Sequence, residues 1–187
     1  LLISVIIITQ LNKKASSDEK AIKLNLQNFF NSAVKLELNS TDGLVVLEKR
    51  ADKWWITYPK EFECDEMRVK DSVIDKFKEL NEEFNKNEID PETKKLKKNY
   101  DLISKNSLPK FGFNSNSVFF KAFLEKRPFK ITVGNHNSIH DSYYVIVQED
   151  ETVALPEQVP VYLIQTMKIS NLNQKPNDLR KRKFYTI

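Results

Sequence analysis

The feature that most constrains the fold is a stripe of large apolar side chains in the middle of the chain. Its members recur at intervals of three and four residues, the spacing that places them on one face of an α-helix. They are Val69, Val73, Phe77, Leu80 and Phe84. Asp65 stands in the position of a helix N-cap, so the pattern predicts a helix over residues 66–85. Burial of each side chain contributes roughly 1.5–3 kcal/mol at most, so the stripe must pack on another layer.

The residues before this helix predict the layer on which it packs. Apolar and polar residues alternate over 34–39, which is the two-residue period of a half-buried strand. Asp42-Gly43 is a hairpin signal, and it leads to a second strand over 44–49. A third strand over 54–58 ends at Pro59, which cannot donate to a ladder. These segments predict a three-stranded antiparallel meander.

The remainder of the chain continues the order of strands, helices, strands and a short helix. A second helical stretch is expected from Pro91 to about Asn106, and a last helical segment over 170–183. Strands are expected over 118–124, 129–133, 143–148 and 159–165. Such an order is typical of an α+β fold, with antiparallel meander sheets and packed helices, rather than of alternating βαβ units. The domain is predicted over 33–187, with 33–106 and 107–187 as possible sub-modules.

The first residues of the chain suggest a membrane anchor. Residues 1–9 are almost wholly apolar, and residues 10–20 are polar and charged. A bilayer span needs about 20 apolar residues, so the run is either the end of a transmembrane helix or a buried strand. The abrupt polar switch favours the helix. We therefore expect an anchor over 1–11, a juxtamembrane linker or helix over 12–32, and an extracytoplasmic domain beyond it. The positive-inside rule would place Lys13 and Lys14 in the cytoplasm, but that rule compares both flanks of a span.

The charge and glycine content exclude two broad classes of function. The 30 basic and 26 acidic residues leave a net charge of +4 that is spread along the chain, so no nucleic-acid partner is expected. The three glycines, Gly43, Gly112 and Gly134, are isolated turn residues, so no Gly-rich nucleotide loop is present in the sequence. If the protein works with ATP, another chain must bind it.

No combination of residues predicts an active site, a cofactor site or a metal site. Cys64 is the only cysteine, and we interpret it as an ordinary half-buried residue. His136 and His140 fall in a hairpin loop, where the helical spacing of a zinc site does not apply. The carboxylates Glu61, Glu63, Asp65 and Glu66 are explained by the electrostatics of a helix start. We therefore expect a protein that is not an enzyme.

Two adjacent tryptophans supply one candidate contact for a partner. Trp54 and Trp55 lie on a predicted strand, so their side chains point to opposite faces. One should enter the core and the other should face outward or a second layer. An exposed tryptophan could stack on a sugar or a partner, although cover by the loop after Pro59 is the favoured interpretation. Trp54 is the candidate partner contact.

Several motifs, in order, resemble a recurring bacterial domain of unknown function. The resemblance covers residues 34–184. The motifs are Trp55-Ile56-Thr57-Tyr58-Pro59, Cys64-Asp65, Phe111-Gly112-Phe113, Phe129-Lys130-Ile131-Thr132-Val133-Gly134, Tyr143-Tyr144-Val145, Val161-Tyr162-Leu163-Ile164 and Asp178-Leu179-Arg180-Lys181-Arg182. Cys64 stands where that family tends to have Ala, and Phe113 where it tends to have Leu.

The resemblance implies a location and partners but no catalytic residues. Such domains are similar to membrane-anchored accessory parts of gliding-motility-type ABC transport systems, encoded with an ATPase and a permease. The expected protein is a non-catalytic subunit in the bacterial cytoplasmic (inner) membrane, single-pass, with its main domain on the periplasmic side. It would act through protein–protein contacts with the permease and ATPase subunits. The second expectation is a ligand-binding module for an envelope polymer or a transported lipid.

The basic end of the chain supplies a second candidate contact. Arg180 and Arg182 lie two residues apart, and such neighbours do not share a helix face. Arg180 is expected to pair within the domain, with a carboxylate or backbone carbonyls. Arg182 is expected to face a partner subunit or anionic lipid headgroups.

Overall fold

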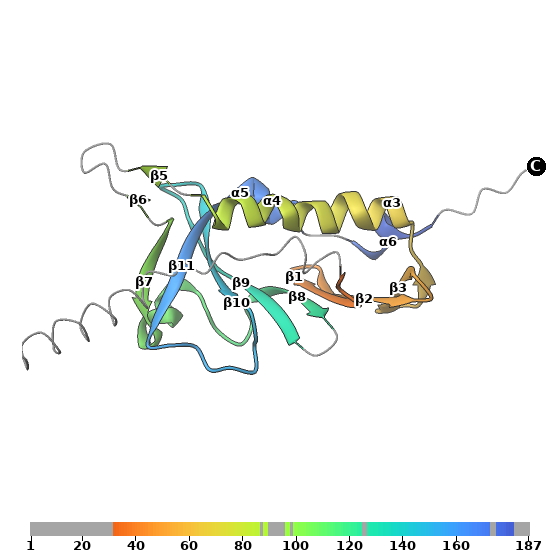
Figure 1. The fold of residues 1–187 in the computed structure, drawn as a ribbon, viewed down its shortest axis with the longest axis horizontal. Helices are drawn as coiled ribbons and strands as arrows, with labels where there is room; N and C mark the ends of the chain where they lie inside the picture. The colour runs from red at the N-terminus through yellow and green to blue at the C-terminus, as the bar shows by residue number, and fades with distance from the viewer. Residues whose placement is uncertain are drawn as a thin grey trace, which may run out of the picture.

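The computed structural model of the chain describes residues 32–86, 88–89, 96–97, 99–124, 127–172 and 175–181. Its main features are one large antiparallel sheet and a layer of helices on one face of that sheet (Figure 1). The predicted anchor and all but the last residue of the predicted linker lie outside the described residues. Within the described part, no helix has both the length and the apolar character needed to cross a bilayer.

The sheet joins strands from both halves of the chain. Its order is β4-β3-β2-β1-β8-β9-β10-β11-β7, and every pairing is antiparallel. The strands are β1 (Lys35–Ser40), β2 (Gly43–Arg50), β3 (Lys53–Tyr58), β4 (Phe62–Glu63), β7 (Tyr100–Ser104), β8 (Val118–Leu124), β9 (Arg127–Asn137), β10 (Ser142–Gln148) and β11 (Gln158–Gln165). Two short strands, β5 (Glu88–Ile89) and β6 (Leu96–Lys97), pair separately. Pairing of β1 with β8 makes a single sheet out of the two candidate sub-modules.

The predicted central helix is confirmed. It consists of α3 (Glu66–Val69), a π-helical turn η1 (Lys70–Ile74) and α4 (Asp75–Phe84). The carboxylate of Asp65 caps its start, because Oδ1 accepts hydrogen bonds from the backbone N–H groups of Met67 and Arg68 at 3.1 and 3.3 Å. The first stripe residues are four apart, slightly more than one α-helical turn. The wider π turn offsets that excess and keeps them over the sheet.

The five stripe residues are all buried and form one core with the sheet. The ring of Phe77 meets that of Phe120 on β8 edge-to-face, with centroids 6.0 Å apart. Phe84, at the other end of α4, meets Tyr162 on β11 at 4.9 Å. The stripe therefore packs on strands that come after it in the sequence as well as on the meander before it.

The second face of the sheet is covered over β10, β11 and β7 by a smaller core. A 3-10 helix, η2 (Lys105–Phe111), supplies Leu108, and Phe113 follows it. These side chains pack on Ile146 of β10 and on Val159 and Val161 of β11. At this end, therefore, side chains cover both faces of the sheet.

Two predicted helices are wrong. The described part of residues 91–106 forms β6, which pairs with β5, then β7 and the start of η2. In β7, pairing with β11 and contact of Tyr100 with Tyr162 override helix propensity. The expected helix over 170–183 is replaced by α5 (Thr166–Ser170) and α6 (Pro176–Leu179). Lys175 is extended, as a residue before proline prefers, so a helix cannot run through it.

Truncation of the central stripe should destabilise the whole domain. Phe77→Ala removes a ring that is almost fully buried. The free energy of unfolding of the domain should therefore fall by about 3–5 kcal/mol. Urea unfolding followed by circular dichroism measures this change. The control is Met67→Ala on the same helix, where the side chain is 72% exposed and the change should stay below about 0.5 kcal/mol. Equal effects of the two variants would contradict the packing described above.

Candidate functional site

The candidate site begins where two neighbouring strands stop pairing. The ladder between β10 and β11 runs from Ser142–Gln165 to Val145–Tyr162 and ends there. Beyond that point β10 continues along β9, and β11 continues along β7. Pro160 lies just past the end of the ladder and has no N–H to donate. The missing donor therefore falls where β11 has no β10 partner.

A groove of about 340 Å³ opens at this place, between the end of β10, the start of β11 and the 149–157 loop that joins them. Its lining is mainly apolar. The lining residues are Val147, Gln148, Glu149, Asp150, Val153, Ala154, Leu155, Pro156, Val159, Pro160 and Tyr162. Val153 is 62% exposed, and Leu102, whose Cα is paired with that of Pro160 across the sheet, is 56% exposed. Large apolar side chains thus lie in and beside the groove.

The loop that forms one wall of the groove is held in place at several points. The Asp150 carboxylate accepts a hydrogen bond from the backbone N–H of Thr152 at 2.9 Å, which stabilises a turn. The Glu151 backbone N–H donates to Pro128 O at 3.2 Å. The Glu151 carboxylate also lies 2.9 Å from the ammonium of Lys121 and 3.8 Å from that of Lys130. The groove is therefore preformed rather than made by a loop without contacts.

The electrostatics of the groove are acidic at the rim and neutral at the floor. The 149–157 loop contains four carboxylates and no lysine or arginine, and Glu149 and Asp150 line the groove itself. Burial raises the pKa of Tyr162 to about 12, with further contributions from Tyr100 and Glu149, so its phenol stays uncharged. This arrangement suits a peptide segment in which an apolar side chain is followed or preceded by a positively charged one.

The structure places Trp54 in the core, so the prediction that it contacts a partner is wrong. Its side chain is 4% exposed, and its backbone N–H donates to the Glu66 carboxylate at 2.7 Å. Trp55 points to the other face, as expected of adjacent strand residues, and is half-buried beneath the guanidinium of Arg50 at 6.0 Å. A buried indole is not available to another protein.

The two arginines near the end of the chain have different outcomes. Arg182 lies outside the described residues. Arg180 is extended, follows the buried Leu179 and pairs with Cys64 as an isolated β-bridge, so the helix on which its geometry was predicted is absent. Its guanidinium lies 5.5 Å from the centroid of the Phe62 ring. Arg180 thus makes a contact within the domain, as predicted. Within the described ranges its side-chain partner is an aromatic ring, in place of the predicted carboxylate or backbone carbonyl.

The polar groups singled out from the sequence have structural contacts. Cys64 is buried, and that burial raises its thiol pKa to about 12. His136 Nε2 lies 3.1 Å from the Asp141 carboxylate and 3.0 Å from the Thr166 hydroxyl. A catalytic relay needs a base that uses one ring nitrogen for the nucleophile and the other for the carboxylate, and here one nitrogen meets both. Thr166 and then His136 lower the pKa of Asp141.

The acidic cluster before the helix is divided among separate structural tasks. Glu61 pairs with Arg50 at 2.9 Å, and Glu63 pairs with Lys181 at 2.9 Å. Asp65 caps the helix and Glu66 accepts from a strand N–H, as described above. No group of three His, Cys, Asp or Glu side chains in the described ranges is arranged to hold a metal ion.

The exposed half of the second sheet face is a weaker candidate surface. Phe119 on β8 lies beneath the ammonium groups of Lys121 and Lys130, at 5.0 and 5.2 Å from its centroid. The same lysines pair with Glu151, and Lys121 also lies 4.0 Å from Glu37. Because the charges on this face neutralise one another, it resembles a solvated sheet surface.

The groove was not predicted from the sequence. Two signals for it were nevertheless present: Pro160 inside a predicted strand, and an acidic loop with Val153 and Leu155 at its centre. Comparison of the chain with protein-family models, curated proteins and solved structures finds no match.

The thiol of Cys64 should be inert while the domain is folded. Because burial raises its pKa to about 12, iodoacetamide at about pH 8 should alkylate it at least roughly a hundredfold more slowly than in urea. The control is a Cys64→Ser chain with Ser138→Cys, which moves the thiol to an exposed turn and should react in the folded state. Reaction of native Cys64 at the rate of the exposed thiol would show that the site is open.

Proposed function

We propose that the chain is a non-catalytic, membrane-anchored accessory subunit of a gliding-motility-type ABC transport system. The order of motifs over 34–184 supports the choice of system, and the apolar 1–9 run supports the anchor. The observation that carries the mode of action is the groove between β10 and β11, which is apolar inside and acidic at its rim. It is a feature for binding rather than for chemistry.

The occupant we propose is a segment of a partner subunit with an apolar side chain and an adjacent Lys or Arg. The apolar side chain would enter between Val147 and Val153, where burial away from water stabilises a complex. The basic residue would lie beside Glu149 and Asp150, where complementary charge favours encounter and orientation. The permease is the expected source of this segment.

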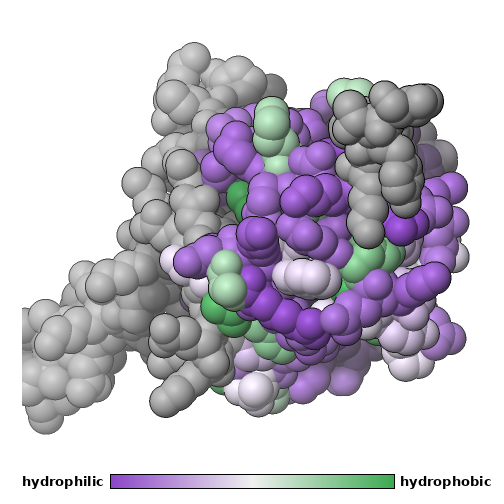
Figure 2. All heavy atoms as spheres, turned by 90° about the vertical axis from the view of Figure 1, so that its right-hand side faces the viewer, coloured by the Kyte–Doolittle hydropathy of each residue, from purple (hydrophilic) through white to green (hydrophobic). Residues whose placement is uncertain are grey.

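The distribution of apolar surface supports this choice of face. The groove and Leu102 gather exposed apolar side chains around the 149–157 loop and the edge strand β7. The side of the molecule that carries α3 lies away from β7 and β11 (Figure 1). Its described surface is mainly hydrophilic, with scattered apolar residues (Figure 2). Gathered apolar surface marks interaction sites more often than scattered residues do.

Site-specific crosslinking in the native cells tests the proposed function. A photoreactive benzoylphenylalanine at Val153 should form a covalent adduct with a membrane subunit of the transport system, identified by mass spectrometry. The same group at Ile139, which is 86% exposed in the 138–141 turn, should not form that adduct. Absence of a transport subunit from the Val153 adducts, or equal capture at both positions, would contradict the proposal.

Charge reversal provides a matched pair of variants for the same complex. Glu149→Lys should lower recovery of the partner, because it removes a rim carboxylate and repels a basic segment. Glu157→Lys makes the same change in the same loop, at an exposed residue outside the groove lining, and should leave recovery unchanged. If both variants unfold at the same temperature as the parent protein, a loss of partner recovery cannot be caused by a loss of stability.

A further inference from the structure

A second cavity lies at the other end of β10 and has the opposite character. It has a volume of about 410 Å³, within the range of small-molecule sites. The lining residues are Ser40, Thr41, Gly112, Asn114, Asn116, Ser117, Val118, Phe120, Val133, Gly134, Asn135, Tyr143, Ile169 and Ser170. None of these side chains is a carboxylate, an ammonium or a guanidinium. The cavity therefore offers hydroxyls, amides and one phenol, without a counter-charge for an ionic ligand.

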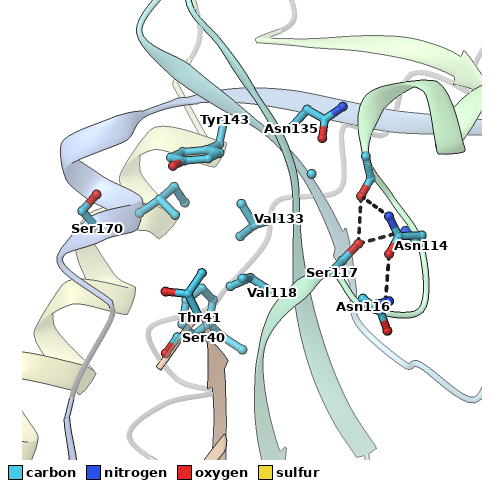
Figure 3. Close-up of a pocket in the computed structure, with 14 residues that line it drawn as sticks. Ser40, Thr41, Asn114, Asn116, Ser117, Val118, Val133, Asn135, Tyr143 and Ser170 are labelled. Atoms are coloured by element: carbon cyan, nitrogen blue, oxygen red, sulfur yellow. Dashed lines mark hydrogen bonds between the residues drawn. The ribbon is translucent and has the colours of Figure 1, made fainter. Parts of the chain in front are cut away.

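Six separate parts of the fold meet to make this cavity. They are the end of β1 with its turn, the 112–117 loop, the start of β8, the bulged part of β9, the start of β10 and the end of α5. Figure 3 shows the polar side chains around the periphery, with Val118 and Val133 between them. An apolar floor inside a ring of hydroxyls and amides is thus assembled from segments far apart in the sequence.

The wall formed by the 112–117 loop is built into the fold. The Asn114 backbone N–H donates to the Ser117 hydroxyl at 2.8 Å, and that hydroxyl donates to Gly112 O at 2.9 Å. Gly112 has a φ of +86°, which favours glycine. A Cβ at Gly112 would collide with Asn135, and one at Gly134 would collide with the backbone of Phe111. The two glycines therefore let the loop and β9 lie in direct contact.

A β-bulge explains why β9 contributes to the cavity. His136 of β9 pairs with Tyr143 of β10, and Val133 of β9 pairs with Val145 of β10. Between these two pairs β9 has one more residue than β10, which is a β-bulge. The extra residue breaks the alternation at Gly134-Asn135 and brings Asn135 to the cavity rim. Bulges of this kind commonly re-aim a side chain beside a binding site.

Several polar groups of the cavity are available to a ligand. Figure 3 draws hydrogen bonds only within the 112–117 loop. The side chains of Thr41, Asn135, Tyr143 and Ser170 make no hydrogen bond with one another or with any other residue that the structure describes. Each can donate and accept, so together they match a ligand whose own groups also do both.

We propose that this cavity binds a neutral oligosaccharide. Sugar hydroxyls both donate and accept, and so match Thr41, Asn135 and Ser170. The C–H faces of a sugar ring match the apolar floor and the ring of Tyr143. Phosphorylated or carboxylated ligands would lack a counter-charge. The site goes beyond the proposed partner groove, and the two lie at opposite ends of β10.

An NMR titration of the 187-residue chain, in a detergent without a sugar headgroup, tests the proposal. The probes are maltose, cellobiose and N,N′-diacetylchitobiose, with triglycine as a neutral non-sugar. At least one disaccharide should give saturable shifts at the amides of Thr41, Asn135 and Ser170, and triglycine should not. If triglycine alone shifts them, the cavity is a peptide site. If none of the disaccharides shifts them, the saccharide site is wrong.

A pair of tryptophan substitutions distinguishes the cavity from adventitious surface binding. Ser170→Trp places an indole at an exposed residue of the cavity rim and should weaken disaccharide binding by roughly tenfold or more. Ser138→Trp makes the same change at an exposed residue outside the lining and should leave the affinity unchanged. Retained binding by the Ser170→Trp variant would overturn the proposal. Neither variant touches the partner groove, so the two proposals fail or survive separately.

Discussion

Contact between the central helix and the sheet is the interaction on which the rest of the structure depends. The stripe residue Phe77 packs on Phe120 of β8, and Phe84 packs on Tyr162 of β11. At the end of the helix, the Asn99 side-chain amide donates to Phe84 O at 3.0 Å. One helix thus holds the N-terminal meander and the C-terminal strands against a common core. In the described sheet these two groups of strands are joined by the pairing of β1 with β8.

That arrangement determines where cavities form. The stripe covers the sheet as far as Tyr162, where the ladder between β10 and β11 also ends. Past this point the apolar groove opens beside Pro160, on strands that the core holds in place. At the other end of β10, α5 and the bulged part of β9 enclose the polar cavity. The apolar groove suits a protein segment and the polar cavity suits a neutral hydroxylated ligand, so the proposals rest on different physical chemistry.

Elements with a strong period could be predicted from the sequence. The helix stripe, the meander and the four later strands appear at the predicted places, because each period repeats over several residues. Strand β9 is longer than predicted and runs to Asn137, so His136 lies on a strand and not in the expected hairpin loop. Strand β7 could not be predicted, because its five residues are held by pairing with β11 rather than by a period of their own. The inward tryptophan could have been assigned: Trp54 shares a face with Ile56, whereas Trp55 shares one with Thr57. Cavities depend on where ladders end and which turns meet, and neither is a local property.

Native-state hydrogen exchange tests the central claim most directly. If the helix and the sheet form one cooperative core, the slowest amides of α4, β1 and β8 should exchange with the same opening free energy and the same denaturant dependence. That free energy should equal the global free energy of unfolding from urea denaturation of the same protein. Exchange of the α4 amides through a separate opening of clearly lower free energy, while β1 and β8 remain protected, would contradict the account.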